Sequence, residues 1–494
     1  MQPLIEGMSR PSPGQHEKIG LAGRWSIAVA LLLAAFYFST SLYISSHRLL
    51  WVDEINTVNF SRLPSWTSIW KALSEGAEGM PPTYFMTVRV FDNLFGHSEL
   101  AVRLPSALAM VAGLLVVFDC ARRLTDGLHG LIAFSVLTCS FLPYYGHEAR
   151  SYALYFMFSA LALWIWVHTR DTPSAAALFG VVVFLGIATH YYAVLILVPY
   201  AAWNVLHWKP WQLPSRKMTA GVAGVLCATA LLWKPIQAQR HQFPPNFWAR
   251  PSPDVLLKAF SDLFPDFLFL LALVMLWVAL VASRDRVLPL QAMQQGERVG
   301  WFFLLIPIAG YFLSEITHIF QLRYLICALP GIAVAVACVL WRHFHGTWRT
   351  PVGVLLILLT WGMAKQVVAA RDPNRYYYSP IRQMLSLQNG AAKDGKRFFV
   401  VCNQARYIEA LYYSKHADQY VWLMLPTVDP HRTRDIMTLA QFYPMHIWTM
   451  DDLRKHASEA ALLVPLPNYL DTLKQAGFKI ENPSPNSLKV VYVK

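Results

Sequence analysis

The sequence predicts a mainly α-helical, polytopic membrane protein with a small α/β domain at its C-terminal end. Of its 494 residues, 55% are hydrophobic and only 14% are charged, and the mean hydropathy is +0.35. A soluble protein of this size carries about a quarter charged residues. Runs of roughly 17–24 apolar residues recur over the first three quarters of the chain, long enough to cross a hydrocarbon core. After about residue 371 they give way to short alternating β and α patterns.

About eleven apolar segments predict membrane spans, and charge sets their orientation. Alternate loops between them are basic, as the positive-inside rule requires. The polar segment 1–24 precedes a full-length apolar run, so it predicts a cytoplasmic N-terminus and an uncleaved first helix. An odd number of spans then places the C-terminus outside. The predicted spans are 25–45, 101–121, 127–146, 151–168, 174–189, 191–207, 218–236, 262–283, 300–317, 322–341 and 351–369.

The interval 46–100 predicts one large external loop. Its segment Thr83–Phe95 is apolar but too short to span, and it contains Arg89 and Asp92. If it crossed the membrane, Arg122 and every later basic loop would change sides. We therefore expect an interfacial helix that lies along the outer leaflet. A second external loop, proline-rich, is expected at about 237–260.

The formal net charge of +13 does not predict a nucleic-acid partner. The cations cluster in short loops between apolar segments, which is topogenic charge, with phosphate and membrane-lipid binding as a secondary possibility. The six cysteines show no CxxC spacing, so neither a disulfide framework nor a zinc site is indicated.

The C-terminal region 371–494 predicts a small external α/β domain. Strands are expected at 396–402, 419–425, 446–450 and 489–493, with helices at 404–415 and 466–476. No glycine-rich phosphate loop opens a helix, so soluble nucleotide binding is not indicated.

Two carboxylates, Asp53 and Glu54, follow the first predicted span on its outer side. Carboxylates near a low-dielectric boundary are costly to desolvate, so they suggest chemistry: a general base that takes a proton from an acceptor hydroxyl or amine. The alternative is a solvated charge pair on a loop.

Three further polar groups are predicted on the same outer face. Glu148 and Arg150 lie between the third and fourth spans, where they could orient an acceptor and pair with a phosphate, or merely form a salt bridge. Arg323 with Tyr324 opens the tenth span, as a bidentate phosphate ligand or an interface anchor. His190 with Tyr191 is either part of the site or an aromatic-belt turn.

As an ordered set these motifs resemble the GT-C fold glycosyltransferases that use polyprenyl-phosphate sugars. The similarity is to the bacterial branch that includes protein O-mannosyltransferases and the lipid A aminoarabinose transferase, and it covers about residues 25–370. The motifs are Asp53-Glu54, Pro81-Pro82-Thr83-Tyr84, Glu99 to Ser106, Ala121 to Leu124, Glu148-Ala149-Arg150-Ser151-Tyr152 and Arg323-Tyr324.

The resemblance implies a site and a reaction. Asp53 would be the catalytic base, with Glu54 adjacent, and Arg323 would hold the lipid phosphate. Many members carry a second external aspartate just after the position of Arg150; here Ala153 or Leu154 stands there, so Glu148 is our substitute.

Around these residues we expect a substrate cavity that opens at the outer leaflet. The resemblance further implies substrate-binding roles for Arg150, Tyr152, His190, Tyr191, Arg323, Tyr324 and Tyr84.

The implied partners are a polyprenyl-phosphate-linked sugar donor, a lipid, glycan or protein acceptor, and membrane lipids, in a cell inner membrane. Direct attack on the anomeric carbon would invert its configuration, since no separate nucleophilic carboxylate is evident. No cofactor is required, although a divalent cation is possible.

The alternative from another class is a transporter or lipid flippase. It predicts ionisable residues near the middle of spans and broken helices in paired repeats. Asp119, Glu315 and Lys365 instead lie near the ends of predicted spans, which favours the transferase.

Overall fold

The computed structural model describes residues 13–207, 214–239, 249–281, 293–345, 347–374, 381–425, 436–463, 467–481 and 490–493. The chain forms two compact units. Unit 1 comprises residues 1–45, 103–233 and 243–371, and unit 2 comprises residues 46–102, 234–242 and 372–494. The predicted domain limits had grouped 46–100 with the membrane segments. By internal contacts, residues 46–102 belong to unit 2, and the predicted division into functional domains stays a prediction.

Unit 1 is built from helices. They are α1 (Pro13–His47), α5 (Glu99–Leu124), α6 (Gly127–Cys139), η1 (Leu142–His147), α7 (Tyr152–His168), α8 (Pro173–Thr189), η2 (Tyr191–Leu197), α9 (Val198–Leu206), α10 (Arg216–Leu231), α11 (Trp233–Gln239), α12 (Pro253–Asp262), α13 (Phe267–Val281), α14 (Gln295–Phe302), α15 (Leu305–Thr317), η4 (Leu322–Ala328), α16 (Leu329–Phe344) and α17 (Arg349–Arg371), where α1, α5 and α11 each cross a unit boundary.

These helices make the chain a multi-pass membrane protein, as predicted. Among the described residues five helices are long and apolar enough to cross a membrane, or up to seven if each of two bent pairs is one span. Four shorter apolar helices of 10–17 residues accompany them. Every predicted span falls on one of these segments, but the number of spans stays a prediction. The two bent pairs, α10 with α11 and α12 with α13, turn by 71° and 46°.

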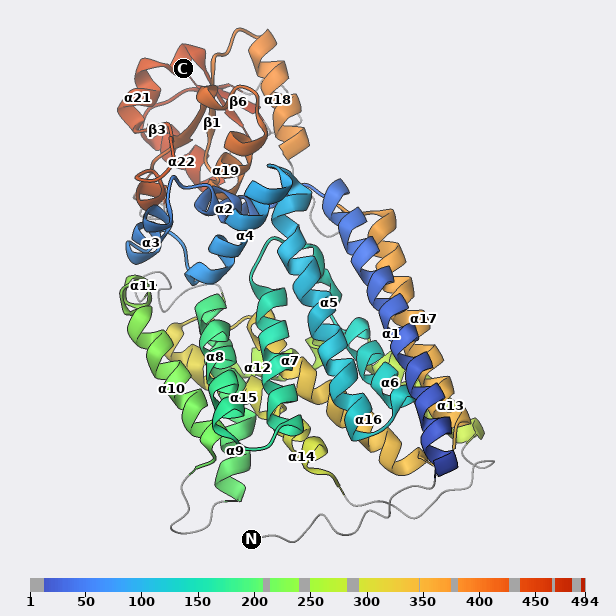
Figure 1. Ribbon diagram of the computed structural model, residues 1–494. Coiled ribbons are helices and arrows are strands. Elements are labelled where there is room, and N and C mark those ends of the chain that lie inside the picture. The colour runs from blue at the N-terminus through green and yellow to red at the C-terminus, as the bar shows by residue number, and fades with distance from the viewer. Residues whose placement is uncertain are drawn as a thin grey trace. The chain divides into compact units, whose positions relative to one another are not determined.

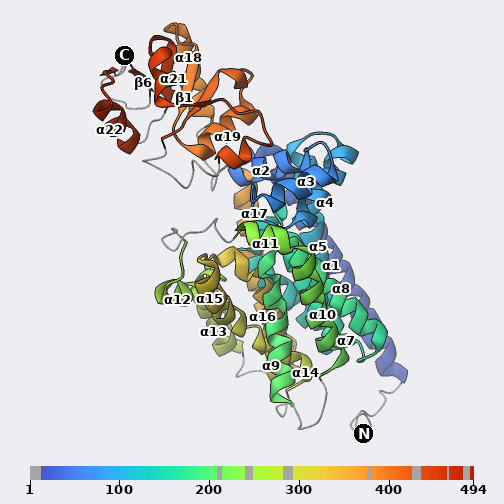
Figure 2. The same cartoon turned by 90° about the vertical axis from the view of Figure 1, so that its left-hand side faces the viewer.

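Close helix contacts in unit 1 bring together segments that are far apart in the sequence. Helices α1 and α17 lie side by side, and the Gln366 amide donates to the Thr40 hydroxyl at 3.1 Å (Figure 1). Helices α8 and α10 approach through glycine: a Cβ on Gly224 would stand 2.5 Å from the Gly180 carbonyl oxygen (Figure 2). Small residues at such contacts are what lipid-embedded helices use to pack closely.

Two of the predicted spans begin with a 3-10 turn rather than an α-helix. Pro199 and Pro330 stand in the first turn of α9 and α16, and the 3-10 turns η2 and η4 precede them directly. Proline has no N–H and its ring excludes the i−4 hydrogen bond, so a regular α-helix that enters these points from upstream is disfavoured. The turn η2 directly follows His190, and the turn η4 contains Arg323.

Unit 2 begins with three short helices in the predicted external loop: α2 (Val52–Ser61), α3 (Trp66–Ser74) and α4 (Pro82–Phe95). The predicted interfacial helix is α4, which starts at Pro82 because proline suits the first helical position. Arg62 donates twice to the buried Asp92, at 2.8 and 3.0 Å, and so ties the end of α2 to α4. On α4, Leu94 and Phe95 are exposed, as an interfacial helix requires.

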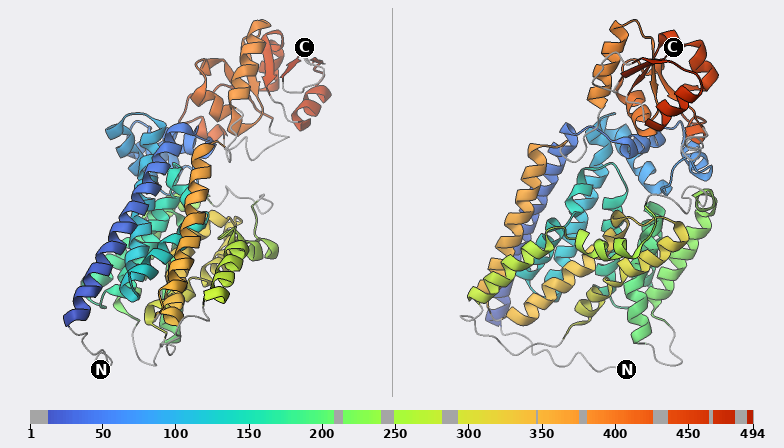
Figure 3. Two further views of the ribbon diagram at one scale, coloured as in Figure 1. Left: turned by 90° about the vertical axis from the view of Figure 1, so that its right-hand side faces the viewer. Right: turned by 180° about the vertical axis from the view of Figure 1, so that it is seen from behind.

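The rest of unit 2 is a six-stranded sheet with helices around it (Figure 3). The strand order is β3-β2-β1-β4-β6-β5; the first four strands are parallel, and β6 pairs antiparallel with β4 and β5. The elements are α18 (Ile381–Lys393), β1 (Phe398–Val401), α19 (Gln404–Tyr413), η5 (Ala417–Gln419), β2 (Tyr420–Leu423), β3 (Ile447–Trp448), α21 (Met450–Lys455), η6 (Ala457–Glu459), β4 (Ala460–Leu463), α22 (Pro467–Gln475), β5 (Ile480–Glu481) and β6 (Val490–Val493).

This sheet confirms the predicted α/β region. Strands β1, β2, β3 and β6 and helices α19 and α22 lie where the sequence predicts them. Strand β1 is buried on both faces: Val400 belongs to one apolar cluster, and Phe399 and Val401 belong to the other. Strand β4 was not predicted, because Ala-Ala-Leu-Leu has no β-branched or aromatic residue.

Candidate functional site

Helix α2 carries the acidic pair at its first turn. Trp51 is the N-cap, so Asp53 and Glu54 stand at the second and third helical positions. Carboxylates there face the positive end of the helix dipole. Asp53 is half-buried, whereas Glu54 is fully buried. Adjacent in sequence, the two carboxylates therefore occupy different environments.

The Glu54 carboxylate serves the local structure. It accepts from the Trp51 backbone amide at 3.3 Å, which closes the capping interaction, and from the Arg48 guanidinium at 3.2 Å. Arg48 and Glu54 expose only 1% and 0% of their side chains. A buried ion pair that also caps a helix is typical of a structural carboxylate. The catalytic role predicted for Glu54 stays a prediction, and Asp53 remains the stronger candidate for the base.

In unit 1 the predicted phosphate ligand lies against aromatic rings. The Arg323 guanidinium carbon stands 5.5 Å from the Tyr152 ring centroid and 5.9 Å from that of Tyr324. The His190 ring packs against both tyrosines, with centroids 5.6 Å from Tyr152 and 4.8 Å from Tyr324. Four residues predicted from three separate loops therefore form one cluster, which we call the Arg323 cluster: Arg323, Tyr324, Tyr152 and His190.

The protonation of His190 follows from its contacts. The Tyr192 amide can only donate, and it donates to His190 Nδ1 at 3.2 Å. Burial, and then the positive charges of Arg150 and Arg323, lower the pKa of His190 to about 3. The ring is therefore neutral near pH 7 and carries its proton on Nε2. His190 presents a hydrogen-bond donor without adding another positive charge.

Two polar atoms of this cluster are buried without a partner among the described residues. They are His190 Nε2 and the Tyr152 hydroxyl, and their side chains are 2% and 0% exposed. An unsatisfied buried donor costs about 1–3 kcal/mol, so such groups usually mark a water or ligand site. Beside Arg323, an anionic ligand would satisfy both donors.

Glu148 and Arg150 stand on the turn between η1 and α7 and are 1% and 4% exposed. The Ser106 hydroxyl donates to the Arg150 carbonyl at 3.1 Å, which fixes this turn to α5. Arg150 acts electrostatically on His190, so the second predicted arginine belongs to the same neighbourhood. Tyr191 follows His190 directly, and its hydroxyl is a further buried polar atom without a partner among the described residues.

The predicted site residues divide between the units. Asp53, Glu54 and Tyr84 belong to unit 2, where Tyr84 is buried on α4 at 2% exposure. The other seven belong to unit 1. Their convergence on one cavity stays a prediction.

Three tyrosines that are not among the predicted site residues hold the cluster. The Tyr155 hydroxyl lies 2.9 Å from the Tyr192 carbonyl and 3.2 Å from the Tyr324 carbonyl, so it links α7 to both 3-10 turns. Tyr192 also donates to the Ile319 carbonyl at 2.6 Å. Tyr145 packs on Tyr152 with centroids 4.8 Å apart. In an apolar run a tyrosine is indistinguishable from an interface residue.

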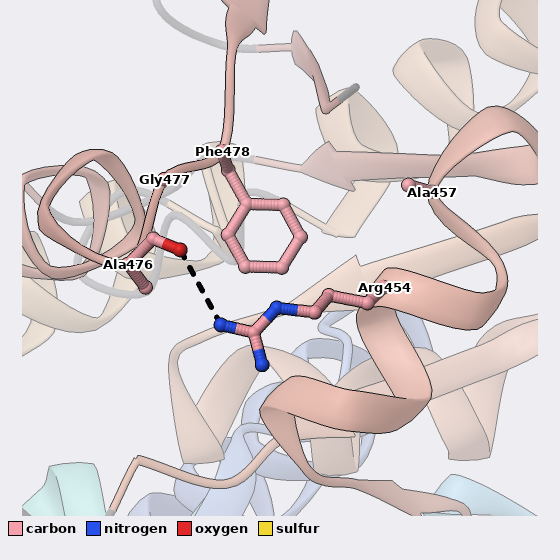
Figure 4. Close-up of a pocket in the computed structure, with 5 residues that line it drawn as sticks. All are labelled: Arg454, Ala457, Ala476, Gly477 and Phe478. Carbon is pink, nitrogen blue, oxygen red and sulfur yellow. Dashed lines mark hydrogen bonds between the residues drawn. The ribbon is translucent and has the colours of Figure 1, made fainter.

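A surface pocket in the C-terminal part of unit 2 lies between α21 and the end of α22 (Figure 4). Its only charged lining residue, Arg454, donates to the Ala476 carbonyl at 3.3 Å and to Asp451 at 2.8 Å, and stacks over Phe478. Because this arginine is bound within its own domain, we do not assign the pocket a role. No group of three or more metal-ligating side chains gathers among the residues that the structure describes.

Part of the chain is similar in sequence to known membrane glycosyltransferases. Residues 80–233 match the family model of dolichyl-phosphate-mannose-protein mannosyltransferases. The undecaprenyl phosphate-alpha-4-amino-4-deoxy-L-arabinose arabinosyl transferase 1 of Pseudomonas fluorescens is 26% identical over 46% of this chain. The matched part spans only 42% of that relative.

The fold is shared over nearly the whole chain with a solved structure. ArnT from Cupriavidus metallidurans, bound to undecaprenyl phosphate, superimposes with a TM-score of 0.60 at 14% identity and covers 95% of this chain and 97% of its own. The apo form gives a TM-score of 0.59 with the same coverage. These similarities confirm the predicted resemblance to GT-C glycosyltransferases and the predicted fold class.

Proposed function

We propose that this protein is an integral membrane glycosyltransferase that moves a sugar from a polyprenyl-phosphate donor to a lipid, glycan or protein acceptor. It acts at the outer face of a cell inner membrane, with residues 1–24 in the cytoplasm and the C-terminal domain outside. The observation that carries the proposal is the Arg323 cluster, in which an arginine packs against aromatic rings beside two buried hydrogen-bond donors that have no partner among the described residues.

The cluster suits the phosphate of a lipid-linked sugar. Arg323 supplies a fixed guanidinium that can pair with two phosphate oxygens. His190 Nε2–H and the Tyr152 hydroxyl supply neutral donors. Arg150 contributes a second positive charge nearby. Such preformed donors stabilise the charge that develops on the phosphate as it leaves.

The relatives support the same donor class. One carries undecaprenyl phosphate in its name as part of the donor, and one solved neighbour has undecaprenyl phosphate bound. The family model's description names a protein acceptor and the relative's name gives none, so we propose a lipid, a glycan or a protein as the acceptor here.

The reaction then needs one base. Asp53 removes the proton from the acceptor hydroxyl or amine as that atom attacks the anomeric carbon. The new glycosidic bond forms while the bond from the anomeric carbon to the phosphate oxygen breaks, and the electron pair leaves with the lipid phosphate. The proton ends on Asp53, and the anomeric configuration inverts. Glu148 orients the acceptor.

A donor panel tests the proposal. The full-length protein in nanodiscs is offered synthetic undecaprenyl-phosphate sugars with lipid A, oligosaccharide and peptide acceptors. We expect transfer from at least one donor by the wild type and about 100-fold less by Arg323→Gln, since one preorganised electrostatic group contributes about that factor. No transfer with any pair, in a protein that also fails to bind undecaprenyl phosphate, contradicts the proposal.

The convergence of base and phosphate site has its own test. Cysteines placed at Asn56, one turn after Asp53 on α2, and at Leu322, beside Arg323, should be joined by a short bifunctional maleimide. A matched pair with one cysteine at the exposed Lys393, in the C-terminal part, should not be joined. Crosslinking of the control pair alone would contradict a shared cavity.

A further inference from the structure

We infer that Tyr413, at the end of α19 in the C-terminal domain, is a positioning residue for the transfer reaction: its hydroxyl anchors the segment that presents Asp53. This inference rests on the proposed function for the role of Asp53. The contact itself lies entirely within unit 2, between residues separated by 363 positions in the sequence.

The Tyr413 hydroxyl connects both ends of the predicted external loop. It accepts a hydrogen bond from the Leu50 backbone amide at 2.6 Å and donates to the Glu99 carboxylate at 2.7 Å. Leu50 precedes the N-cap of α2, and Glu99 is the first residue of α5. Hydrogen bonds in such a chain polarise and strengthen one another, and the bond to an ionised carboxylate is the stronger kind.

Asp53 is thereby held from two sides. Three residues before it, Leu50 is bound to Tyr413; one residue after it, Glu54 is bound to Arg48 and to the Trp51 amide. Glu54 fixes the helix start within its own segment, whereas Tyr413 fixes that segment to the C-terminal domain. The second contact therefore helps to set where the Asp53 carboxylate stands relative to the body of unit 2.

The remainder of α2 also packs on the C-terminal domain, so α19 and its neighbours form the surface against which this helix lies. The Phe60 ring meets Tyr443 edge to face with centroids 5.5 Å apart. Tyr412, next to Tyr413, interacts with Arg62 at the end of α2. Leu49 packs against the apolar cluster on one face of the sheet.

This arrangement gives the C-terminal domain a specific task. General-base catalysis requires the carboxylate to stay within hydrogen-bonding reach of the acceptor, and a displacement of about 1 Å can cost roughly 100-fold in rate. A helix of ten residues at the start of a long loop does not hold that position alone. The domain supplies the rigidity, and Tyr413 contributes a polar contact at Leu50, three residues before Asp53.

The decisive variant is Tyr413→Phe, which removes only the hydroxyl. Its matched control is Tyr492→Phe on β6 of the same sheet, which removes the hydroxyl that donates to Asp394 at 2.5 Å. Glu99→Gln keeps an oxygen that accepts from the Tyr413 hydroxyl, so this variant should behave much like the wild type. All are measured as full-length protein in nanodiscs.

The first readout needs no substrate. Amide hydrogen exchange over residues 49–58 should be faster in Tyr413→Phe and unchanged in Tyr492→Phe, with similar thermal unfolding of all three proteins. Unchanged exchange in Tyr413→Phe overturns the inference. Because no turnover is involved, this arm is independent of the proposed function.

The second readout is catalytic. With the synthetic undecaprenyl-phosphate sugar that the wild type uses, Tyr413→Phe should lower kcat by about tenfold and leave the Kd for undecaprenyl phosphate unchanged. In an Asp53→Glu background, where the carboxylate is already displaced, the added loss should be smaller. Faster exchange with an unchanged kcat, or the same loss in both backgrounds, overturns the role. A wild type inactive with every donor counts against the proposed function instead.

Discussion

At the scale of single residues, the acidic pair is where neighbours in sequence have different environments. Asp53→Asn should leave the protein folded and lower transfer by roughly 10²–10⁴-fold, the usual contribution of a general base. Activity is measured with the lipid-linked donor, and folding by the midpoint of thermal unfolding in detergent. Retained transfer in Asp53→Asn would remove this residue from the role of base.

Glu54→Gln should lower stability rather than transfer, the opposite of Asp53→Asn. It keeps an oxygen for the Trp51 amide but removes the charge that compensates the buried Arg48, and breaking such a pair costs about 3–5 kcal/mol. We expect a lower unfolding midpoint with transfer per folded molecule largely kept. A stable Glu54→Gln protein without transfer would restore Glu54 to the catalytic pair.

His190 gives a pH prediction. Its folded pKa of about 3 lies below the ordinary 6.5, so the unfolded chain binds the extra proton first. The stability from neutral His190 is present above about pH 6.5 and is lost as the pH falls toward the folded pKa. The unfolding midpoint of the wild type should therefore fall more steeply between about pH 7 and about pH 4 than that of His190→Gln. Parallel curves for the two proteins would contradict a buried neutral histidine.

At the scale of elements, the α8–α10 contact depends on the absence of side chains. A Cβ on Gly224 would stand 2.5 Å from a backbone oxygen, which cannot move away as a flexible side chain can. Gly224→Ala should therefore separate the helices and lower the unfolding midpoint. In Gly390→Ala, a control on α18 with nothing within 4 Å of the added carbon, the midpoint should stay or rise slightly, because alanine favours helix. Equal midpoints for both variants would show that the two helices tolerate the methyl group.

The elements were largely predictable because each has a strong local signal. Long apolar runs gave the helices of unit 1, and β-branched or aromatic runs such as 398–401 and 420–423 gave the strands. The 3-10 turns before Pro199 and Pro330 were not predicted. The two prolines mark where each α-helix begins, but they do not indicate the type of turn that precedes it. It also missed β4, whose alanines and leucines suit either state.

The candidate site was predictable by residue type but not by environment. His190, Tyr152, Arg323 and Tyr324 were named separately and lie together in the structure. The burial of Glu54 depends on Arg48, and the contact of Leu50 depends on Tyr413. Such pairings depend on tertiary packing, which no local pattern records.

At the scale of the whole molecule, unit 2 constrains the membrane topology. It is one compact body built from residues 46–102, 234–242 and 372–494, and a bilayer cannot divide a compact body. These segments are therefore expected on the same side of the membrane, and the positive-inside rule predicts that this side is the outer one. An external 46–102 also agrees with α4 being too short to span and exposing Leu94 and Phe95.

Labelling of single cysteines tests this topology. In a chain with the exposed native Cys227 replaced by serine, cysteines are introduced at Lys71, Asp451 or Arg123, whose side chains are 71%, 77% and 52% exposed. A membrane-impermeant maleimide added to intact spheroplasts should label the first two positions, and the third only after the membrane is opened. If positions 71 and 123 were both labelled in intact spheroplasts, they would lie on the same side of the membrane. That result would contradict both the interfacial placement of α4 and the orientation predicted by the positive-inside rule. Labelling of position 71 without position 451 would show that the two parts of unit 2 lie on opposite sides of the membrane. It would therefore contradict both the compact unit 2 and the anchoring of α2 by Tyr413.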